Sequence, residues 1–247
     1  MNILVTGGTG GLGRPTVAAL RSSGHQVRVL SRRPADGRVV GDLRTGSGLA
    51  AALNGIDTVV HCATNRRKDT PGTGRLLDAA RAAGVSHVVF ISIVGADDNP
   101  YPYYRDKVVT EKLIADSGIP FTILRATQFH DFVAMFLRPQ RRLPFITVLD
   151  LEDQPIAVEE VAARLAELAA APPAGRVADI GGPERLHLRT LAEQWQTAHG
   201  THKKIRMLPL GGATVRAFRR GNHMTALPGY GTRTFADYAA ADARSEA

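Results

Sequence analysis

The feature that most constrains this chain is a run of glycines directly after its first apolar stretch. Residues 2–6 are mostly apolar and β-branched, and Gly7, Gly10 and Gly13 then recur at every third position before helical apolar spacing at 17–20. β-Branched residues favour a strand, whereas glycines permit a tight turn and close approach of the backbone. The chain therefore begins as strand, turn and helix, which is the first unit of an α/β fold.

Strand and helix signals continue to alternate along the chain. This alternation predicts a parallel sheet with helices on both faces. Gly24 and Gly84 follow two helical stretches, where a left-handed residue commonly ends a helix. The expected strands are 2–6, 26–30, 58–62, 87–93, 121–124 and 176–180, and the expected helices are 16–23, 46–53, 72–83, 103–117 and 159–171.

The C-terminal part has a looser pattern. Helical patches at 188–199 and 213–220, a strand-like stretch at 205–208 and a Gly/Pro-rich segment through Gly231 follow Gly181. We expect an α/β fold, a Rossmann-like doubly wound parallel sheet with a small C-terminal cap. The expected domains are 1–180, which binds NAD(P), and 181–247, a substrate-side cap that does not fold independently.

The glycine loop favours a dinucleotide ligand. A pyrophosphate must approach backbone N–H groups at a helix start, and a side chain on the turn would hold it away. Gly13 would let the helix pack closely on the sheet. The alternative is a glycine-rich turn that binds nothing.

Two arginines follow the second expected strand. An acidic residue at this point would bond a ribose 2′-hydroxyl and exclude a 2′-phosphate, but the sequence has Arg32 and Arg33 instead. Guanidinium groups suit a dianionic phosphate, so NADPH (NADP) is the expected cofactor. The alternative is that both arginines only solvate a loop.

Composition excludes several other classes. The chain has 31 Lys plus Arg against 23 Asp plus Glu, but its basic clusters, 66–68 and 203–206, are small, which disfavours nucleic-acid binding. The single cysteine, Cys62, cannot form an internal disulfide, and the first residues do not resemble a signal peptide. No apolar run approaches the ~18 residues of a membrane span. We expect a cytoplasmic protein.

Short motifs spread over the chain carry a family resemblance. They are TGGTGGLGR at 6–14, GDL at 41–43, HCAT at 61–64, FISIVGA at 90–96, Lys107 with EKL at 111–113, TILRATQF at 122–129 and DIGGPE at 179–184. Together these segments resemble the short-chain dehydrogenase/reductase superfamily and, more narrowly, its atypical NmrA-like branch, which includes isoflavone-reductase-like and quinone-reductase-like enzymes and catalytically silent NADP sensors. The resemblance implies that Asp42 faces the adenine, that the turn at Ala63 lines the cofactor and that Lys107 holds the nicotinamide ribose.

The loop and the resemblance together predict the cofactor site. The sequence departs from the superfamily at the usual Asn-Ala-Gly turn, which reads Cys-Ala-Thr, and in having Ser92 only 11 residues before Tyr103. The expected cofactor-binding residues are Gly7, Thr9, Gly10, Gly11, Leu12, Gly13, Arg32, Arg33, Asp42, Leu43, Cys62, Ala63, Thr64, Ser92 and Lys107.

Tyr103 and Lys107 are the candidate catalytic pair. They stand four residues apart on an expected helix, so both side chains leave the same face. The ammonium would favour the phenolate, and the phenol would give a proton to a carbonyl that receives hydride. Tyr101 and Tyr104 leave the register open, and the alternative is that the tyrosines pack a cap against the sheet.

The substrate is expected beyond the strand at 121–124. This segment leaves the sheet at its carboxyl edge, where open α/β folds bind ligands, and its aromatic content suits a planar or aromatic small molecule. We expect Cys62 to pack as a small apolar residue rather than to act as a nucleophile. His199 and His202 have no carboxylate or cysteine partners in metal-ligand spacing, so no metal site is expected. The expected substrate residues are Gln128, Phe129, His130 and Phe132.

These features predict an NADPH-dependent oxidoreductase that reduces a carbonyl, quinone or activated double bond of a small organic molecule. A non-catalytic NADP(H) sensor is the alternative. A nucleotide-sugar epimerase or dehydratase is disfavoured, because that branch carries a larger substrate domain than the roughly 65 residues after Gly181. The substrate, the direction of hydride transfer and whether the chain forms a homo-oligomer stay open.

Overall fold

The structure is a computed structural model that describes residues 1–64 and 68–246. Contacts within the chain define two compact units. Unit 1 comprises Met1–Ser92, Tyr101–Arg125 and Val158–Ala178, and unit 2 comprises Ile93–Pro100, Ala126–Ala157 and Asp179–Ala247. Each unit is described on its own below.

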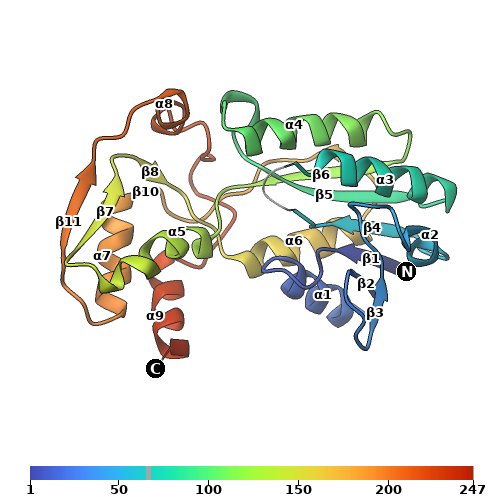
Figure 1. The fold of residues 1–247 in the computed structure, drawn as a ribbon, viewed down its shortest axis with the longest axis horizontal. Coiled ribbons are helices and arrows are strands. Elements are labelled where there is room, and N and C mark those ends of the chain that lie inside the picture. The colour runs from blue at the N-terminus through green and yellow to red at the C-terminus, as the bar shows by residue number, and fades with distance from the viewer. Residues whose placement is uncertain (65–67, 247) are drawn as a thin grey trace. The chain divides into compact units, whose positions relative to one another are not determined.

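Unit 1 is built on a seven-stranded sheet of order β3-β2-β1-β4-β5-β6-β9 (Figure 1). The registered pairs are parallel: β1 pairs with both β2 and β4, which puts the first strand in the interior of the sheet. This order confirms the expected Rossmann-like doubly wound sheet. The strands are β1 (Asn2–Thr6), β2 (Gln26–Ser31), β3 (Arg38–Val40), β4 (Thr58–His61), β5 (His87–Ile93), β6 (Phe121–Ala126) and β9 (Gly175–Arg176).

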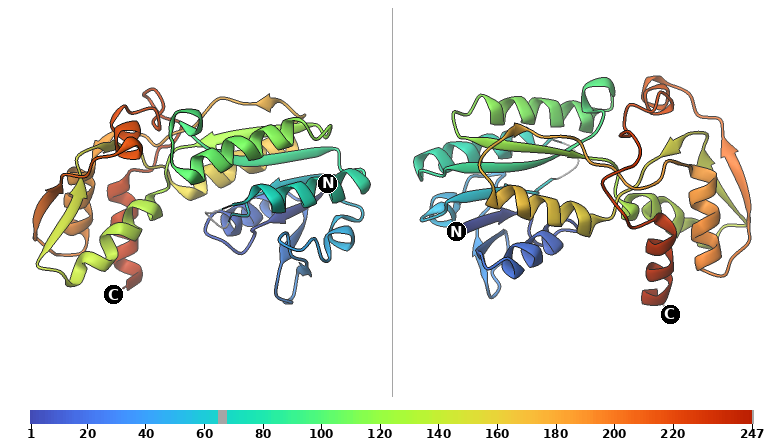
Figure 2. Two further views of the ribbon diagram at one scale, coloured as in Figure 1. Left: turned by 45° about the horizontal axis from the view of Figure 1, so that its top comes forward. Right: turned by 180° about the vertical axis from the view of Figure 1, so that it is seen from behind.

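Helices cover both faces of this sheet. In Figure 1, α3 (Thr70–Ala82) and α4 (Pro102–Ala115) lie together on one face, and the view from behind in Figure 2 shows α1 (Gly13–Ser22) beside α6 (Val158–Ala170) on the other. The short α2 (Leu49–Leu53) packs against α3. Buried apolar residues of the strands and of these helices, among them Leu4, Val59 and Phe90, form the core between the layers. Because both faces are covered, the central strands are buried and mostly apolar.

Local chemistry explains where elements differ from expectation. The first helix starts at Gly13, three residues before the expected Thr16. The helix expected at 46–53 begins only at Leu49, because Gly46 and Gly48 have φ of +85° and +74°, outside the helical region. The strand expected at 176–180 pairs with β6 over Gly175–Arg176, with an isolated bridge between Ala126 and Ile180.

Unit 2 has its own core around Trp195, Phe235 and Ile146. The parallel pair β7–β11 and the antiparallel pair β8–β10 form two small sheets. The elements of unit 2 are η1 (Ala96–Asp98), α5 (His130–Leu137), η2 (Arg138–Arg142), β7 (Phe145–Leu149), β8 (Glu152–Asp153), β10 (Leu186–His187), α7 (Leu188–Ala198), β11 (Lys204–Leu208), α8 (Ala213–Arg219) and α9 (Phe235–Glu246). Of these, α7, α8 and β11 match expected segments, whereas the others had no prediction.

The units do not divide the chain at a single point. The domain boundary proposed after residue 180 lies near the last crossover between units, at 178/179, but residues 93–100 and 126–157 also belong to unit 2. Residues after 178 thus share a core with segments from the middle of the chain, as Ile146 and Trp195 illustrate. Across residues 1–64 and 68–246, no helix is both long and apolar enough to cross a bilayer.

Candidate functional site

Protein atoms leave no room for a side chain at three glycines of the loop between β1 and α1. Gly7 has φ of +68°, and a Cβ there would lie 2.7 Å from Cα of Ala63. A Cβ on Gly13 would overlap the carbonyl oxygen of Gly7 and come within 2.6 Å of Gly8 Cα. A Cβ on Gly8 would lie 2.8 Å from Val29. These three glycines let the turn lie flat against β2, β4 and the start of α1.

Gly10 and Gly11 differ, because the protein leaves space beside them. A Cβ on Gly10 would have only the carbonyl oxygen of Gly7, at 3.2 Å, nearby, and one on Gly11 would meet no described atom within 4 Å. Both are exposed, as is Thr9, and they lead directly into α1. The first N–H groups of a helix lack intrahelical acceptors and carry partial positive charge. The open glycines therefore leave this helix start accessible to an anion such as a pyrophosphate.

Arg14, in the first turn of α1, is a residue that the sequence did not single out. Its Nε donates to the carbonyl oxygen of Thr9 at 2.8 Å, and the side chain is exposed. This bond ties the guanidinium to the β1–α1 loop. The signal in the sequence was an arginine directly after the third glycine.

Arg32 and Arg33 are presented by a compact turn at the end of β2. The Ser31 hydroxyl donates to the carbonyl oxygen of Arg33 at 2.9 Å and accepts its N–H at 3.2 Å. Both arginines are exposed, and among the described residues no carboxylate pairs with either. The two guanidiniums thus keep their donors available for an anionic ligand.

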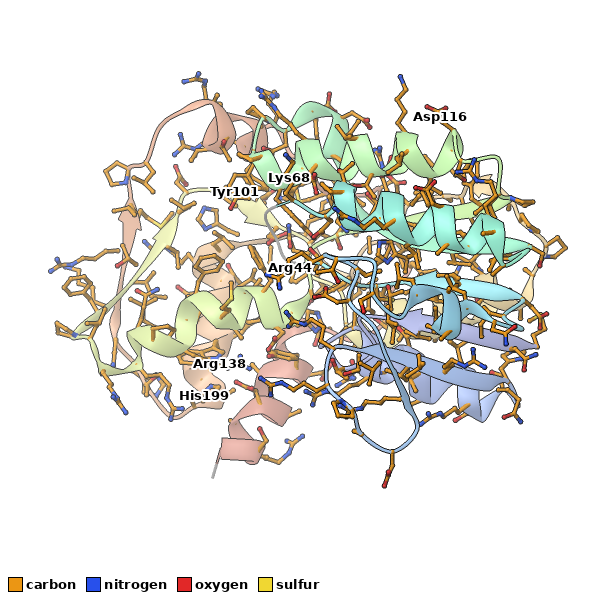
Figure 3. The ribbon with its side chains drawn as sticks, turned by 45° about the vertical axis from the view of Figure 1, so that its right-hand side comes forward. Arg44, Lys68, Tyr101, Asp116, Arg138 and His199 are labelled. Carbon is orange, nitrogen blue, oxygen red and sulfur yellow. The ribbon has the colours of Figure 1, made fainter. Side chains whose placement is uncertain are left out.

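The segment after β3 is also fixed by local bonds. The Asp42 carboxylate accepts the N–H of Arg44 at 2.8 Å and lies 3.8 Å from the Arg44 guanidinium, which is labelled in Figure 3. Leu43 is half-buried and packs against the unit 1 core. A Cβ on Gly72 of α3 would lie 3.4 Å from Leu43. Asp42 and Leu43 thus have fixed places at the end of the strand.

The turn after β4, residues 62–64, contacts the glycine loop. Ala63 lies against Gly7, and its N–H donates to the Thr6 hydroxyl at 3.4 Å. Burial raises the pKa of the Cys62 thiol to about 12, although a hydrogen bond with Thr16 and the charge of Lys107 act in the opposite direction. Cys62 is therefore a neutral thiol, which fits the expected packing role better than a nucleophile.

Lys107 and Ser92 lie at the carboxyl end of β5. Lys107 is 4% exposed, and its Nζ donates to the carbonyl oxygen of Ile91 at 3.1 Å and lies 4.6 Å from the Phe90 ring centre. Burial lowers the pKa of Lys107, while nearby Asp69 opposes this shift. Ser92 is 5% exposed, and no hydrogen-bond partner meets its Oγ within 1–64 and 68–246. A buried ammonium and a hydroxyl that lacks a protein partner are groups that a bound ribose could use.

The three tyrosines at the start of α4 have different environments. Tyr104 is 1% exposed and belongs to the core, whereas Tyr101, labelled in Figure 3, is 47% exposed. Tyr103 is half-buried, and its ring centre lies 5.6 Å from Lys107 Nζ. Of the three, Tyr103 is therefore the one that the helix places beside the lysine.

A buried ion pair stands next to this lysine along α4. Glu111, one turn after Lys107, accepts two hydrogen bonds from Arg125 at 2.8 and 2.6 Å. Arg125 is 3% exposed. The bidentate pair fixes the end of β6 against α4.

The expected substrate residues belong to unit 2. Gln128, Phe129 and Phe132 are half-buried, at or just before the start of α5. His130 is 2% exposed; its Nε2 lies 3.0 Å from the carbonyl oxygen of Pro155, and its ring packs against Phe235 and Tyr238. The structure thus places His130 in the interior of unit 2.

The remaining candidates from the sequence are the metal ligands and the basic clusters. No group of three or more His, Cys, Asp or Glu side chains in the described parts of the chain could hold a metal ion. Arg66 and Arg67, from one of the basic clusters, lie outside the described residues.

Known proteins are similar to this chain in sequence. Photosystem II assembly factor Ycf39 of Cyanophora paradoxa is 33% identical over 147 residues, which are 52% of this chain but only 46% of that protein. The (4-alkanoyl-5-oxo-2,5-dihydrofuran-3-yl)methyl phosphate reductase of Streptomyces griseus is 30% identical over 223 residues, 85% of this chain and 77% of that protein.

Among solved structures, NADPH-dependent quinone oxidoreductase QOR2 of Escherichia coli, complexed with NADPH, has a TM-score of 0.83. It covers 97% of this chain and 99% of its own at 22% identity, so it shows a shared fold. A family model described as NAD(P)H-binding matches residues 7–172, from the first glycine of the β1–α1 loop to just beyond α6. The chain therefore belongs to this NAD(P)H-binding family, as its glycine loop and parallel sheet predicted.

Proposed function

We propose that this protein is an NADPH-dependent oxidoreductase that reduces a small organic substrate. The observation that carries the proposal is the open side of the β1–α1 loop, where Gly10 and Gly11 leave space at the start of α1, with Arg32 and Arg33 available at the end of the neighbouring β2. The pyrophosphate would bind at the helix start beside Arg14. The 2′-phosphate would bind the arginine pair, which favours NADPH over NADH.

The residues at the end of β5 and on α4 would place the nicotinamide end. NADPH, when bound, supplies a hydride. Lys107 would bind the nicotinamide ribose through its buried ammonium, which Ile91 and Phe90 already hold in place. The Ser92 hydroxyl would form a hydrogen bond with the cofactor. Tyr103 would donate a proton to the substrate oxygen that becomes an oxyanion after hydride transfer.

The substrate class is supported by the relatives. The Streptomyces griseus relative is named as a reductase of a ring that carries an oxo group, and QOR2 is named as a quinone oxidoreductase. A carbonyl, quinone or activated double bond is therefore the proposed target. Gln128, Phe129 and Phe132 of unit 2 are the proposed substrate contacts, whereas the interior position of His130 favours a structural role.

NADPH oxidation at 340 nm with quinones, aldehydes and enones tests this proposal. We expect turnover with at least one class and a loss of turnover in Lys107→Ala. Tight binding of NADPH without oxidation in the presence of any of these acceptors would refute the enzymatic proposal.

That outcome would favour a second function, an NADP(H)-binding regulatory protein. The Ycf39 relative, which is named as an assembly factor, supports this alternative. Tyr103→Phe distinguishes the two functions. In an enzyme it should lower turnover, whereas in a regulatory protein it should alter neither NADPH binding nor the regulatory activity.

A further inference from the structure

His61 is a buried polar residue to which the proposed chemistry gives no task. It ends β4 directly before the turn at residues 62–64, is 1% exposed and pairs in register with Thr6 of β1. Its Nδ1 lies 2.6 Å from the Thr6 hydroxyl, and its Nε2 lies 2.9 Å from the Thr73 hydroxyl of α3. One imidazole therefore joins three segments of unit 1.

The direction of every hydrogen bond in this set can be worked out. Thr73 gives its only hydroxyl hydrogen to the carbonyl oxygen of Asp69, so it must accept from His61 Nε2. A neutral imidazole has one N–H, so Nδ1 is an acceptor and Thr6 donates to it. The Thr6 oxygen then accepts the N–H of Ala63. The chain of bonds runs from Ala63 through Thr6, His61 and Thr73 to Asp69, with no donor duplicated.

The surroundings keep this imidazole neutral. The His61 ring stacks on Phe90, with ring centres 5.5 Å apart, and Lys107 Nζ lies 4.6 Å from the centre of the same Phe90 ring. Burial, and then the positive charge of Lys107, lower the pKa of His61 to about 3. A protonated His61 would donate from both nitrogens and place a second positive charge near the buried ammonium. Only the neutral Nε2–H form satisfies the whole chain of bonds.

We propose that His61 is a positioning residue, which holds the turn at residues 62–64 against the glycine loop through the Thr6 hydroxyl and ties that turn to α3 through Thr73. The inference rests on the proposed function, because it gives this turn a place in the cofactor site. Thr6 immediately precedes Gly7, which contacts Ala63, so the bond between Thr6 and His61 lies where the loop and the turn meet.

Spectroscopy of the full chain tests the state of His61 without a ligand. Long-range ¹H–¹⁵N correlation of the imidazole nitrogens should show His61 as the neutral Nε2–H form throughout pH 5–8. An Nδ1–H form, or titration of His61 in this range, would overturn the proposal.

Cofactor affinity tests the consequence, with Thr6 as the site of change. Thr6→Val keeps the shape of the side chain but removes the hydroxyl that bonds both His61 and Ala63, and we expect it to weaken NADPH binding by about 5- to 30-fold, the effect of one to two hydrogen bonds. Thr6→Ser restores the hydroxyl and should retain the native Kd within about twofold. His61→Phe, which keeps a ring against Phe90 but breaks both bonds, should weaken binding by about 10- to 30-fold.

Thr122→Val is the matched control. Thr122 bonds buried His87 at 2.9 Å, but His87 begins β5, at the end of the strand away from Lys107 and Ser92. The Thr122 hydroxyl also accepts the N–H of Ala174 at 3.1 Å, so this variant, like Thr6→Val, should lose one histidine bond and one backbone bond, yet leave the NADPH Kd unchanged. A native Kd in Thr6→Val, or equal losses of NADPH affinity in Thr6→Val and Thr122→Val, would overturn the positioning role of His61. Absence of NADPH binding by the unaltered protein would instead overturn the proposed function itself.

Discussion

Gly10→Val separates the fold of the β1–α1 loop from its ligand. The backbone at Gly10 lies outside the left-handed region, so valine adds no strain there. Its Cβ would lie 3.2 Å from the carbonyl oxygen of Gly7, which needs a shift of only a few tenths of an ångström. We therefore expect the free energy of unfolding to change by less than about 1 kcal/mol.

The effect on the cofactor should be far larger. The isopropyl group would occupy the space that a pyrophosphate needs to reach the N–H groups at the start of α1. Each charge-assisted hydrogen bond contributes about 1.5–3 kcal/mol, so the loss of two would weaken NADPH binding by about 10²- to 10⁴-fold. Calorimetric titration measures the affinity, and thermal unfolding measures the stability of the same sample.

Two other glycines provide controls. Gly211 in unit 2 is exposed and lies outside the left-handed region, and a Cβ there would meet no described atom within 4 Å, so Gly211→Val should affect neither property. Gly13→Ala should instead destabilise the fold, because its Cβ would overlap the Gly7 carbonyl. Native NADPH affinity in a folded Gly10→Val protein would show that the phosphates bind elsewhere.

Three further predictions concern the interior of unit 1. Tyr103→Phe should lower turnover by ~10²- to 10⁴-fold with little change in NADPH affinity, whereas Lys107→Ala should reduce both; normal turnover in Tyr103→Phe would remove the phenol from the mechanism. The pKa of His61 is lowered to about 3 in the folded protein, so this imidazole takes up a proton in the unfolded chain at a higher pH than in the folded one. Its contribution to stability is therefore fully present above about pH 6.5 and decreases as the pH falls toward 3. Relative to His61→Phe, urea unfolding should show a loss of about 2 kcal/mol in unfolding free energy by pH 5, and parallel pH profiles of the two proteins would contradict this. Glu111→Gln should cost about 3–5 kcal/mol in unfolding free energy because it leaves the Arg125 charge buried without its partner, while a loss below about 1 kcal/mol would contradict a strong pair.

Local sequence patterns predicted unit 1 well. The strands at 2–6 and 87–93 have the expected bounds, and Gly24 and Gly84 have the left-handed φ of +80° and +72° expected after helices. Each of these signals lies within a few neighbouring residues. The same locality explains why the Arg32–Arg33 pair could be placed at the end of β2.

Unit 2 was harder to predict because its elements depend on distant partners. Among the described residues β7 pairs with β11, in the register Phe145 to Lys204, so β7, unlike the expected β11, had no large sheet to reveal it. His130 looks like a loop residue in sequence, but its ring is enclosed by Phe235 and Tyr238 from the end of the chain. A local pattern contains no information on such pairings.

Contacts between distant residues also limited the prediction of the candidate cofactor site. His61 was visible as a polar residue at the end of an apolar strand, but its partners Thr6 and Thr73 come from two other elements. Its neutral state follows only from the complete set of donors and acceptors. The environments of the tyrosines likewise depend on the fold, since Tyr104 is buried in the core, whereas the Tyr103 ring centre lies 5.6 Å from Lys107 Nζ.

Calorimetric titration of the protein with NADPH and with NADH tests the central claim most directly. Arg32 and Arg33 should make NADPH bind about 10- to 100-fold more tightly than NADH, from roughly 1.5–3 kcal/mol of charge-assisted bonding to the 2′-phosphate. The Arg32→Ala, Arg33→Ala double variant should bind both cofactors with similar affinity, close to that of the unaltered protein for NADH. Equal affinities in the unaltered protein, or an undiminished preference in the double variant, would contradict the assignment of this site to NADPH.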